Sequence, residues 1–481
     1  MAILRKNAGY NVLLSLTQLA FPLITFPYAS RILGPKALGA VSLADNFTVY
    51  FLIFSGLGIP LYGLREVAKV KDNRQLLGQT FSSLLFIHLV TAIVAVILFF
   101  LLTVSIDKLY SNFALYQIGM AIVLGSVFIA EWFFQGLEEF KYITIRTVII
   151  RLCTVLLLFI LVKGPQDSSI YFGLNLIVAI ASAGFNMYYI SKKIHISFKN
   201  LTIRKHLRPL FLLLASALVT TIYLMFDTVI LSFLTNDTTV GYYAASMRVA
   251  KISLSVLGAV SLVLLPRLTF LFNQEDNAAA ANLLNKSLRF VCFLSVPIAI
   301  GIFCLAKEII SVFAGQAYLP GVNSLRVLSF LAVVIGLAQV LSNQILLPLM
   351  QEKKIFYASI VGVIISLSLN FLLIPRFLQL GAAVSSLFAE FSVTLVLYLY
   401  VRKHFSVVLP VQVFLKSVLA SLTFFLIRYL ILQITIIPIL VLTFTVGLSA
   451  IVYLLVQLFI WRNKDVIEVL SGYPGLRFLI K

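Results

Sequence analysis

The sequence predicts an all-α, polytopic membrane protein with about fourteen transmembrane helices. Of its 481 residues, 61% are hydrophobic and only 11% are charged, and the mean hydropathy is +1.06. This composition cannot supply the polar surface that a water-soluble fold needs. Apolar runs long enough to cross the bilayer recur along the whole chain, and they are continuous rather than alternating, which argues against a membrane β-barrel.

The expected spans follow one another with short connections, and each is near or above the minimum length for crossing the hydrocarbon core at about 1.5 Å of rise per residue. In chain order they are residues 11–33, 40–62, 80–104, 113–134, 145–162, 168–190, 210–233, 241–265, 288–306, 323–347, 355–375, 379–401, 412–432 and 437–461.

Basic residues in the connections indicate the orientation, because lysine and arginine are retained on the cytoplasmic side during insertion. If the N-terminus lies inside, the inner connections carry far more of the 37 basic residues than the outer ones, and the connection 191–208 is the most basic. An even number of spans then returns the basic C-terminal tail to the same side. We therefore expect both termini to face the cytoplasm.

Two short echoes in the sequence indicate a parallel internal repeat. The segment ILGPKALGAVSLADN (32–46) resembles FLTNDTTVGYYAASMR (233–248), with Gly39 aligned to Gly241, and QGLEEFKYITI (135–145) resembles MQEKKIFYASI (350–360). Six spans separate the members of each pair, an even number, so the repeats have the same direction in the membrane. We expect two six-helix lobes, residues 1–205 and 206–404, followed by an appended helix pair and cytoplasmic tail, residues 405–481.

Two cations inside one predicted span are the strongest indication of a binding site. A charged side chain at the centre of a span costs about 2.5–3.5 kcal/mol on insertion scales and therefore indicates a function. Arg248 and Lys251 lie three residues apart on one helix face, about 10–16 Å from the outer end of the eighth span. The two cations repel each other, so they suit an anion in a water-filled cavity. An ion pair between Arg248 and Asp227 of the preceding span is the alternative.

Further polar residues in or beside the spans are candidates for the same cavity: Gln18, Arg31, Asp45, Glu131, Arg151 and Glu390. Serine, threonine and glutamine stripes also line ordinary helix interfaces in membranes, which is the alternative interpretation of these polar faces. Arg31 and Arg428 lie near span ends, and we expect both to reach toward the head groups.

Several classes of function find no support in the sequence. The formal charge of +20 lies between apolar runs rather than in a recognition element, so we expect no nucleic-acid partner. The histidines and cysteines have no metal-ligand spacing, and no phosphate loop or nucleophile elbow occurs. We therefore expect no cofactor, no metal and no enzymatic activity.

Three segments carry a resemblance to a known family, the polysaccharide exporters and lipid-linked oligosaccharide flippases of the multidrug/oligosaccharidyl-lipid/polysaccharide (MOP) superfamily, often called Wzx-type flippases. They are FPYASRILGPKALGAVSLADN (26–46), EWFFQGLEEFKYITIRTVIIRL (131–152) and FDTVILSFLTNDTTVGYYAASMRVAK (226–251). The similarity extends over essentially the whole chain.

This resemblance implies a two-lobed transporter of the bacterial cytoplasmic membrane that turns polyprenyl-pyrophosphate-linked oligosaccharide, such as an O-antigen or capsule repeat unit, to the outer leaflet by alternating access. The implied partners are this lipid-linked sugar, the bilayer, and a polysaccharide polymerase with its chain-length machinery. The implied roles fall on the residues found above. Arg248, Lys251 and Arg151 would contact phosphate, Arg31 and Asp45 would lie near the outer mouth, and Gln18 and Asp227 would also contact substrate. Asp227, Glu131 and Glu390 are candidates for ion coupling.

Three other functions remain open. A multidrug exporter of the same superfamily would place acids in its cavity to bind cationic drugs, whereas these spans hold more basic than acidic residues. A membrane polymerase or ligase of lipid-linked sugars would need a large outer loop, and every outer connection expected here is short. A lipid-binding scaffold without transport activity is the third.

Overall fold

The computed structural model describes residues 2–199, 201–274, 276–403 and 408–461, and within these residues it contains helices and no strand. The chain divides into two compact units, Met1–Gly241 and Tyr242–Lys481. The proposed lobes at 1–205 and 206–404 and the appended pair at 405–481 stay a prediction.

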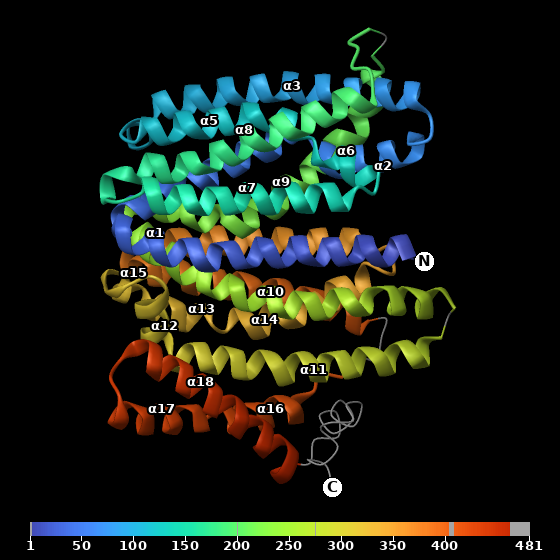
Figure 1. The fold of residues 1–481 in the computed structure, drawn as a ribbon. Coiled ribbons are helices and arrows are strands. Elements are labelled where there is room, and N and C mark those ends of the chain that lie inside the picture. The colour runs from blue at the N-terminus through green and yellow to red at the C-terminus, as the bar shows by residue number, and fades with distance from the viewer. Residues whose placement is uncertain (1, 200, 275, 404–407, 462–481) are drawn as a thin grey trace. The chain divides into compact units, whose positions relative to one another are not determined.

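The first unit is built from long helices joined by short turns. In chain order they are α1 (Ala2–Gly56), α2 (Ile59–Val70), α3 (Arg74–Ser105), α4 (Asp107–Tyr110), α5 (Phe113–Ile129), α6 (Glu131–Gly136), α7 (Phe140–Leu161), the 3-10 helix η1 (Pro165–Asp167), α8 (Ser168–Lys193) and α9 (Ile203–Leu234). Helices α3, α5, α8 and α7 lie side by side in this order (Figure 1). Helix α9, expected in the second lobe, packs against α1, α2 and α3.

The second unit contains most of α10 and every later helix. These elements are α10 (Asp237–Asn273), α11 (Asn277–Cys304), α12 (Ala306–Phe313), η2 (Gln316–Gly321), α13 (Val322–Leu328), α14 (Leu331–Gln339), the π-helix η3 (Val340–Leu346), α15 (Glu352–Arg402), α16 (Val411–Ser421), α17 (Thr423–Ile434), α18 (Pro438–Leu455) and the π-helix η4 (Val456–Ile460). The three C-terminal helices α16–α18 pack on α11 and α12.

Large apolar side chains cover much of the outer surface, which is the arrangement expected of a protein whose solvent is lipid. Ile97 and Leu101 on α3 are 53% and 54% exposed, and Leu156 and Ile160 on α7 are 62% and 64% exposed. A soluble protein would present a contiguous apolar surface of this kind only where it binds a partner. The chain is a multi-pass membrane protein.

Nine helices in the described part are long and apolar enough to cross a membrane, or ten if the bent pair Gln316–Leu328 and Leu331–Leu346 is one span. Two of the nine, Phe21–Val70 and Glu352–Arg402, have 50 and 51 residues, and a span needs only about 20. The seventh and eighth expected spans fall on α9 and α10, where several side chains lie outside the described part. The number fourteen therefore stays a prediction.

Both of these long helices are broken where the sequence places a connection between spans. In α1 the break is at Gly34, with φ 74° and ψ 173°, followed by Pro35. Glycine adopts a positive φ without strain, and proline suits the first position of the next helix. In α15 the break is at Leu378, with φ 51° and ψ −130°.

Candidate functional site

Several polar residues of the first unit lie around a break between two of its helices. The expected span 113–134 is interrupted at Ala130, whose φ and ψ are both 40°, so that α5 ends at Ile129 and α6 begins at Glu131. A break at membrane depth frees backbone carbonyls that must find other donors. The side-chain amide of Asn186, a fully buried residue on α8, donates to the carbonyl oxygen of Ile129.

Arg146 on α7 connects this break to two helices. Its guanidinium pairs with the carboxylate of Glu131, and its Nη1 donates to Oδ1 of Asn186 at 2.6 Å. The hydroxyl of Tyr142 donates to the same Oδ1 at 3.2 Å. Arg146 is only 6% exposed, whereas the side chain of Glu131 is 39% exposed, so the buried guanidinium connects α6, α7 and α8 at a partly exposed carboxylate.

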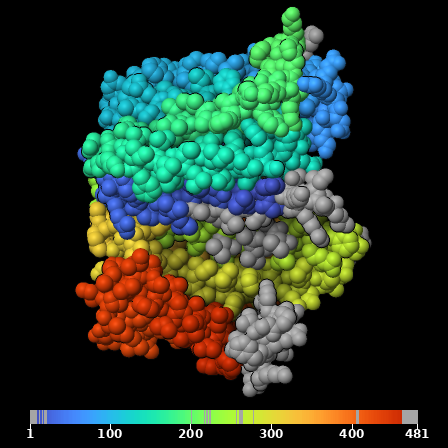
Figure 2. Space-filling view, viewed as in Figure 1, coloured from blue at the N-terminus to red at the C-terminus, as the bar shows by residue number. Residues whose placement is uncertain are grey.

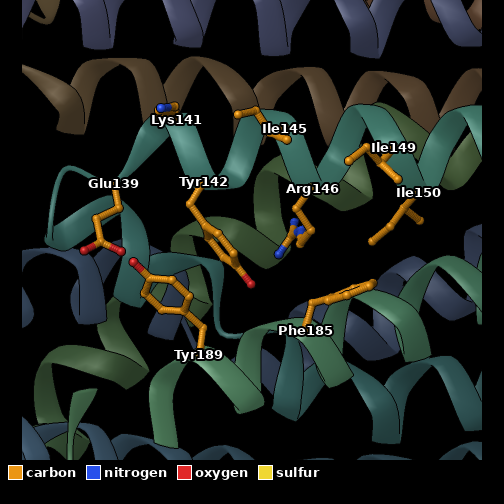
Figure 3. Close-up of a pocket in the computed structure, with 9 residues that line it drawn as sticks. All are labelled: Glu139, Lys141, Tyr142, Ile145, Arg146, Ile149, Ile150, Phe185 and Tyr189. Carbon is orange, nitrogen blue, oxygen red and sulfur yellow. The ribbon is translucent and has the colours of Figure 1, made fainter. Parts of the chain in front are cut away.

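A cavity of about 560 Å³ opens between α7 and α8 beside Arg146. Both helices lie at the surface of the first unit (Figure 2). Figure 3 shows Tyr142 and Arg146 on α7 and Phe185 and Tyr189 on α8 around this space; the other lining residues are Glu139, Lys141, Ile145, Ile149 and Ile150. The lining is mainly apolar and includes the charged residues Glu139, Lys141 and Arg146, so the cavity can hold an amphipathic molecule.

The predicted ion-coupling residue Glu131 and the predicted phosphate ligand Arg151 occur in the same polar region. Arg151, half-buried on α7, lies within electrostatic range of Glu131, and its guanidinium carbon is 5.6 Å from the centroid of the Phe21 ring. Glu131 therefore lies close to two arginines, Arg146, with which it pairs, and Arg151.

The other predicted residues of the first unit lie on α1 and α9. Arg31 is exposed, Asp45 is half-buried, and Asp227 is 7% exposed and within electrostatic range of Tyr50. Arg31, Asp45 and Asp227 all have interaction partners in the fold. The side chain of Gln18 lies outside the described part of the structure.

The remaining predicted residues belong to the second unit. Arg248 and Lys251 lie on α10, with Arg248 half-buried and Lys251 exposed, and Glu390 is half-buried on α15. All three have interaction partners. That these residues share one cavity with Arg151 stays a prediction.

An apolar groove of about 410 Å³ lies in the second unit, along α11, α12, α17 and α18. Ser449 and Tyr453 are the two hydroxyl-bearing residues of its otherwise apolar lining. Tyr453 donates its hydroxyl to the carbonyl oxygen of Phe293 at 2.7 Å, so this polar group is already satisfied. The groove can hold a hydrocarbon chain.

Two parts of this geometry were missed from the sequence. Arg146 is not among the predicted site residues, although the expected span 145–162 includes it, and in the structure it is buried within α7. Arg428, expected to reach the head groups, instead pairs with Glu308 of α12 at 2.7 Å. The feature of the sequence that could have identified Arg146 is its position inside the expected span 145–162.

The fold is that of a multi-pass, all-α membrane protein, and it is similar to the folds of the lipid II flippase MurJ and of a MATE family transporter. A structure of the lipid II flippase MurJ in an inward closed conformation matches with a TM-score of 0.72 at 18% identity, over 95% of this chain and 99% of that chain. An inward-facing multidrug resistance MATE family transporter of the MOP superfamily matches with a TM-score of 0.65 at 13% identity, over 80% and 93% of the two chains.

The chain belongs to the family described as polysaccharide biosynthesis protein, whose model matches residues 4–272. A relative in Escherichia coli (strain K12), named "Putative O-antigen transporter", is 24% identical over 409 residues, which is 83% of this chain and 97% of that protein. The resemblance found in the sequence and the all-α, polytopic fold class are thereby confirmed.

Proposed function

We propose that this protein is a flippase that moves polyprenyl-pyrophosphate-linked oligosaccharide, such as an O-antigen or capsule repeat unit, from the cytoplasmic to the outer leaflet by alternating access. The observation that carries the proposal is membership of the polysaccharide biosynthesis family over residues 4–272. A relative named for O-antigen transport and a similar solved structure named as a lipid II flippase support it.

The groove and the cations each match the chemistry of one part of such a substrate. The apolar groove of the second unit suits a polyprenyl chain, and Arg248 and Lys251 suit its pyrophosphate. Arginine contacts phosphate through two parallel hydrogen bonds and lysine acts as a point charge. In this proposal Arg151 adds a phosphate contact, and Arg31 and Asp45 lie near the outer mouth.

Ion coupling and topology complete the proposal. Asp227, Glu131 and Glu390 are the acids that would bind the coupling ion, and Glu131 would do so by releasing Arg146. Both termini would face the cytoplasm of a bacterial cell, since the basic connections then lie inside. A polysaccharide polymerase with its chain-length machinery would act on the flipped product.

The test is translocation of a labelled polyprenyl-pyrophosphate oligosaccharide in liposomes that contain the purified protein. We expect Arg248→Ala with Lys251→Ala to abolish translocation while the protein still inserts and elutes as a single species. The matched control is Arg402→Ala with Lys403→Ala, which removes two exposed cations at the end of α15 and should leave the rate unchanged. Wild-type flipping by the Arg248 and Lys251 double variant would refute the cation site.

A multidrug exporter is the second candidate, because the fold also matches a MATE family transporter. The same liposomes distinguish the two functions when they are loaded with a fluorescent cationic drug. A flippase should leave the drug gradient unchanged and move the lipid-linked sugar, whereas an exporter should do the reverse.

A further inference from the structure

The cavity between α7 and α8 has one charged end and one apolar end. Glu139 caps the start of α7, and Lys141 lies in the first turn of this helix. The apolar lining residues of α7 lie farther along the helix and are Ile145, Ile149 and Ile150. Figure 3 shows Glu139 and Lys141 at one end of the cavity and Ile149 and Ile150 at the other. Lys141 and Ile149 are separated by about 12 Å along the helix, so the cavity matches an amphiphile with a charged head and an apolar chain.

The cavity opens on a surface that faces lipid. Ile145 and Ile149 on α7 are 46% and 53% exposed, and Phe185 on α8 is 56% exposed. Apolar side chains of this kind are stable at the surface of a membrane protein because they contact hydrocarbon rather than water. Helix α7 begins at the end that is expected to face the cytoplasm, so the charged end lies at the inner interface and the apolar end lies deeper. A phospholipid of the inner leaflet has the same order of head and chains.

The charged end of the cavity offers both an acceptor and a cation. The carboxylate of Glu139 pairs with the ammonium of Lys193 on α8 through Oε1, whereas its Oε2 has no hydrogen-bond partner among the described residues. The side chain of Glu139 is 23% exposed, and rotation about its terminal torsion, which is soft, can turn either oxygen toward the cavity. Lys141 is exposed and pairs with no acid in the part of the chain that the structure describes. Arg146, by contrast, is committed to Glu131 and Asn186.

Aromatic rings beside Glu139 favour an ammonium group. The ammonium of Lys193 lies 5.1 Å from the centroid of the Tyr189 ring while it pairs with Glu139. The ring of Tyr142 packs against that of Tyr189 with 4.5 Å between the centroids, and both rings line the cavity. Ring faces and carboxylates attract the same cations. This end of the cavity therefore already binds one ammonium of the protein and has a free acceptor for a second.

The two charges of the cavity select among head groups. A phosphate suits Lys141, because a cation at the interface attracts lipid phosphate. A head group with a phosphate and no cation would leave Glu139 without a partner and would be repelled by its carboxylate. A zwitterionic head group, in which an ammonium follows the phosphate after two carbons, satisfies both residues.

We propose that the cavity between α7 and α8 binds a phospholipid with an ethanolamine head group. The ammonium of the lipid donates to Glu139 and lies beside the ring of Tyr189, and the phosphate contacts Lys141. The acyl chains follow the exposed side chains of Ile145 and Ile149 into the bilayer. Lipid bound in this way connects α7 to α8 at their cytoplasmic ends and is distinct from any transported substrate.

The test measures binding of single phospholipids to the purified full-length protein in detergent by native mass spectrometry. Phosphatidylethanolamine, phosphatidylcholine and phosphatidylglycerol with the same acyl chains are compared, so that only the head group differs. We expect the ethanolamine lipid to bind about tenfold more tightly than the glycerol lipid, which has no ammonium. It should bind about threefold more tightly than the choline lipid, whose ammonium has no N–H to donate. Equal binding of the three lipids would overturn the inference.

Two variants separate a lipid site from a structural ion pair. Glu139→Gln removes the acceptor for the lipid ammonium and should lower binding of the ethanolamine lipid to the level of the glycerol lipid. Lys193→Gln breaks the same ion pair but keeps the carboxylate, so it should bind the ethanolamine lipid at least as tightly as the wild type. An equal loss of binding in both variants would show that the ion pair, and not the carboxylate, is what matters.

Two further variants control for charge and for folding. Glu138→Gln removes the same charge one residue away, at a side chain that is 56% exposed and outside the lining, and should bind like the wild type. A loss in this variant as large as that in Glu139→Gln would refute a specific contact. Lys141→Gln changes an exposed side chain and should weaken the ethanolamine and glycerol lipids alike, by about threefold, through loss of the phosphate contact. Unchanged binding would refute the place assigned to the phosphate.

A second measurement follows from the linkage between binding and stability. A lipid that binds only the folded protein raises its unfolding midpoint. Added phosphatidylethanolamine should therefore raise the midpoint of the wild type and of Lys193→Gln more than that of Glu139→Gln. Both measurements are made without lipid-linked sugar, so their outcome is independent of the proposed function.

Discussion

Replacing Gly39 with alanine should destabilise the first unit, because the backbone of α1 touches the backbone of α10 at this residue. A Cβ added at Gly39 would overlap the carbonyl oxygen of Asp237 and lie 2.7 Å from its carbonyl carbon and 2.9 Å from the amide nitrogen of Gly241. These neighbours are all backbone atoms, so no flexible side chain can move aside. The helices must separate, and overpacking of this kind costs about 1–3 kcal/mol.

The measurement is the thermal unfolding midpoint of the purified protein in detergent, compared with Gly184→Ala. A Cβ at Gly184 would meet nothing within 4 Å, so that control keeps the change in chemistry and removes the overlap. Alanine favours a helix over glycine by about 0.5–1 kcal/mol, so the control should be as stable as the wild type or more stable. Equal midpoints for Gly39→Ala and Gly184→Ala would refute the close crossing.

The contact is reciprocal, which gives a second measurement. A Cβ at Gly241 would overlap the carbonyl oxygen of Pro35, just as one at Gly39 would overlap that of Asp237. Once either alanine has separated the helices, the other should cost less, so the double variant should lose less stability than the sum of the single losses. Additive losses would show that the two glycines act at independent contacts.

Three further perturbations test other parts of the fold. Arg146→Leu removes the charged hydrogen bond to the fully buried Asn186 as well as the pair with Glu131, and should lower the free energy of unfolding by about 1.5–3 kcal/mol. Adding Glu131→Leu should recover only a small part of that loss, because the carboxylate is 39% exposed. The ammonium of Lys108 donates to carbonyl oxygens at the end of α9. Burial lowers the pKa of Lys108. Lys108→Met removes these hydrogen bonds, so it should reduce the free energy of unfolding by about 1 kcal/mol and lower the thermal unfolding midpoint. Burial, with a smaller effect of Lys205, lowers the pKa of His206 below 6.5. Because unfolding then lets His206 bind a proton, stability should fall as the pH drops below about 6.5, and His206→Gln should flatten that part of a pH titration of the unfolding midpoint.

The sequence by itself determined the class of fold and much of its segmentation. A chain that is 61% hydrophobic requires lipid rather than water around most of its surface. Lipid offers no hydrogen-bond partners, so the backbone groups have to pair with one another within helices. The break after the first span was predictable for a local reason, since glycine at 34 tolerates a positive φ and proline at 35 starts a helix. No local signal of this kind marks the break at Ala130. The carbonyl oxygen that this break leaves free, that of Ile129, is satisfied by Asn186 on another helix.

Only the tertiary structure decided which polar residues meet. The helical period placed Arg248 and Lys251 on one face, but no local rule connects Glu308 with Arg428 or Arg146 with Asn186, which lie far apart in the sequence. The repeat aligned Gly39 with Gly241, and the fold then set each glycine against the backbone of the other segment. Sequence periodicity fixes which face of a helix is polar, whereas packing between distant helices selects the partner that satisfies each charge.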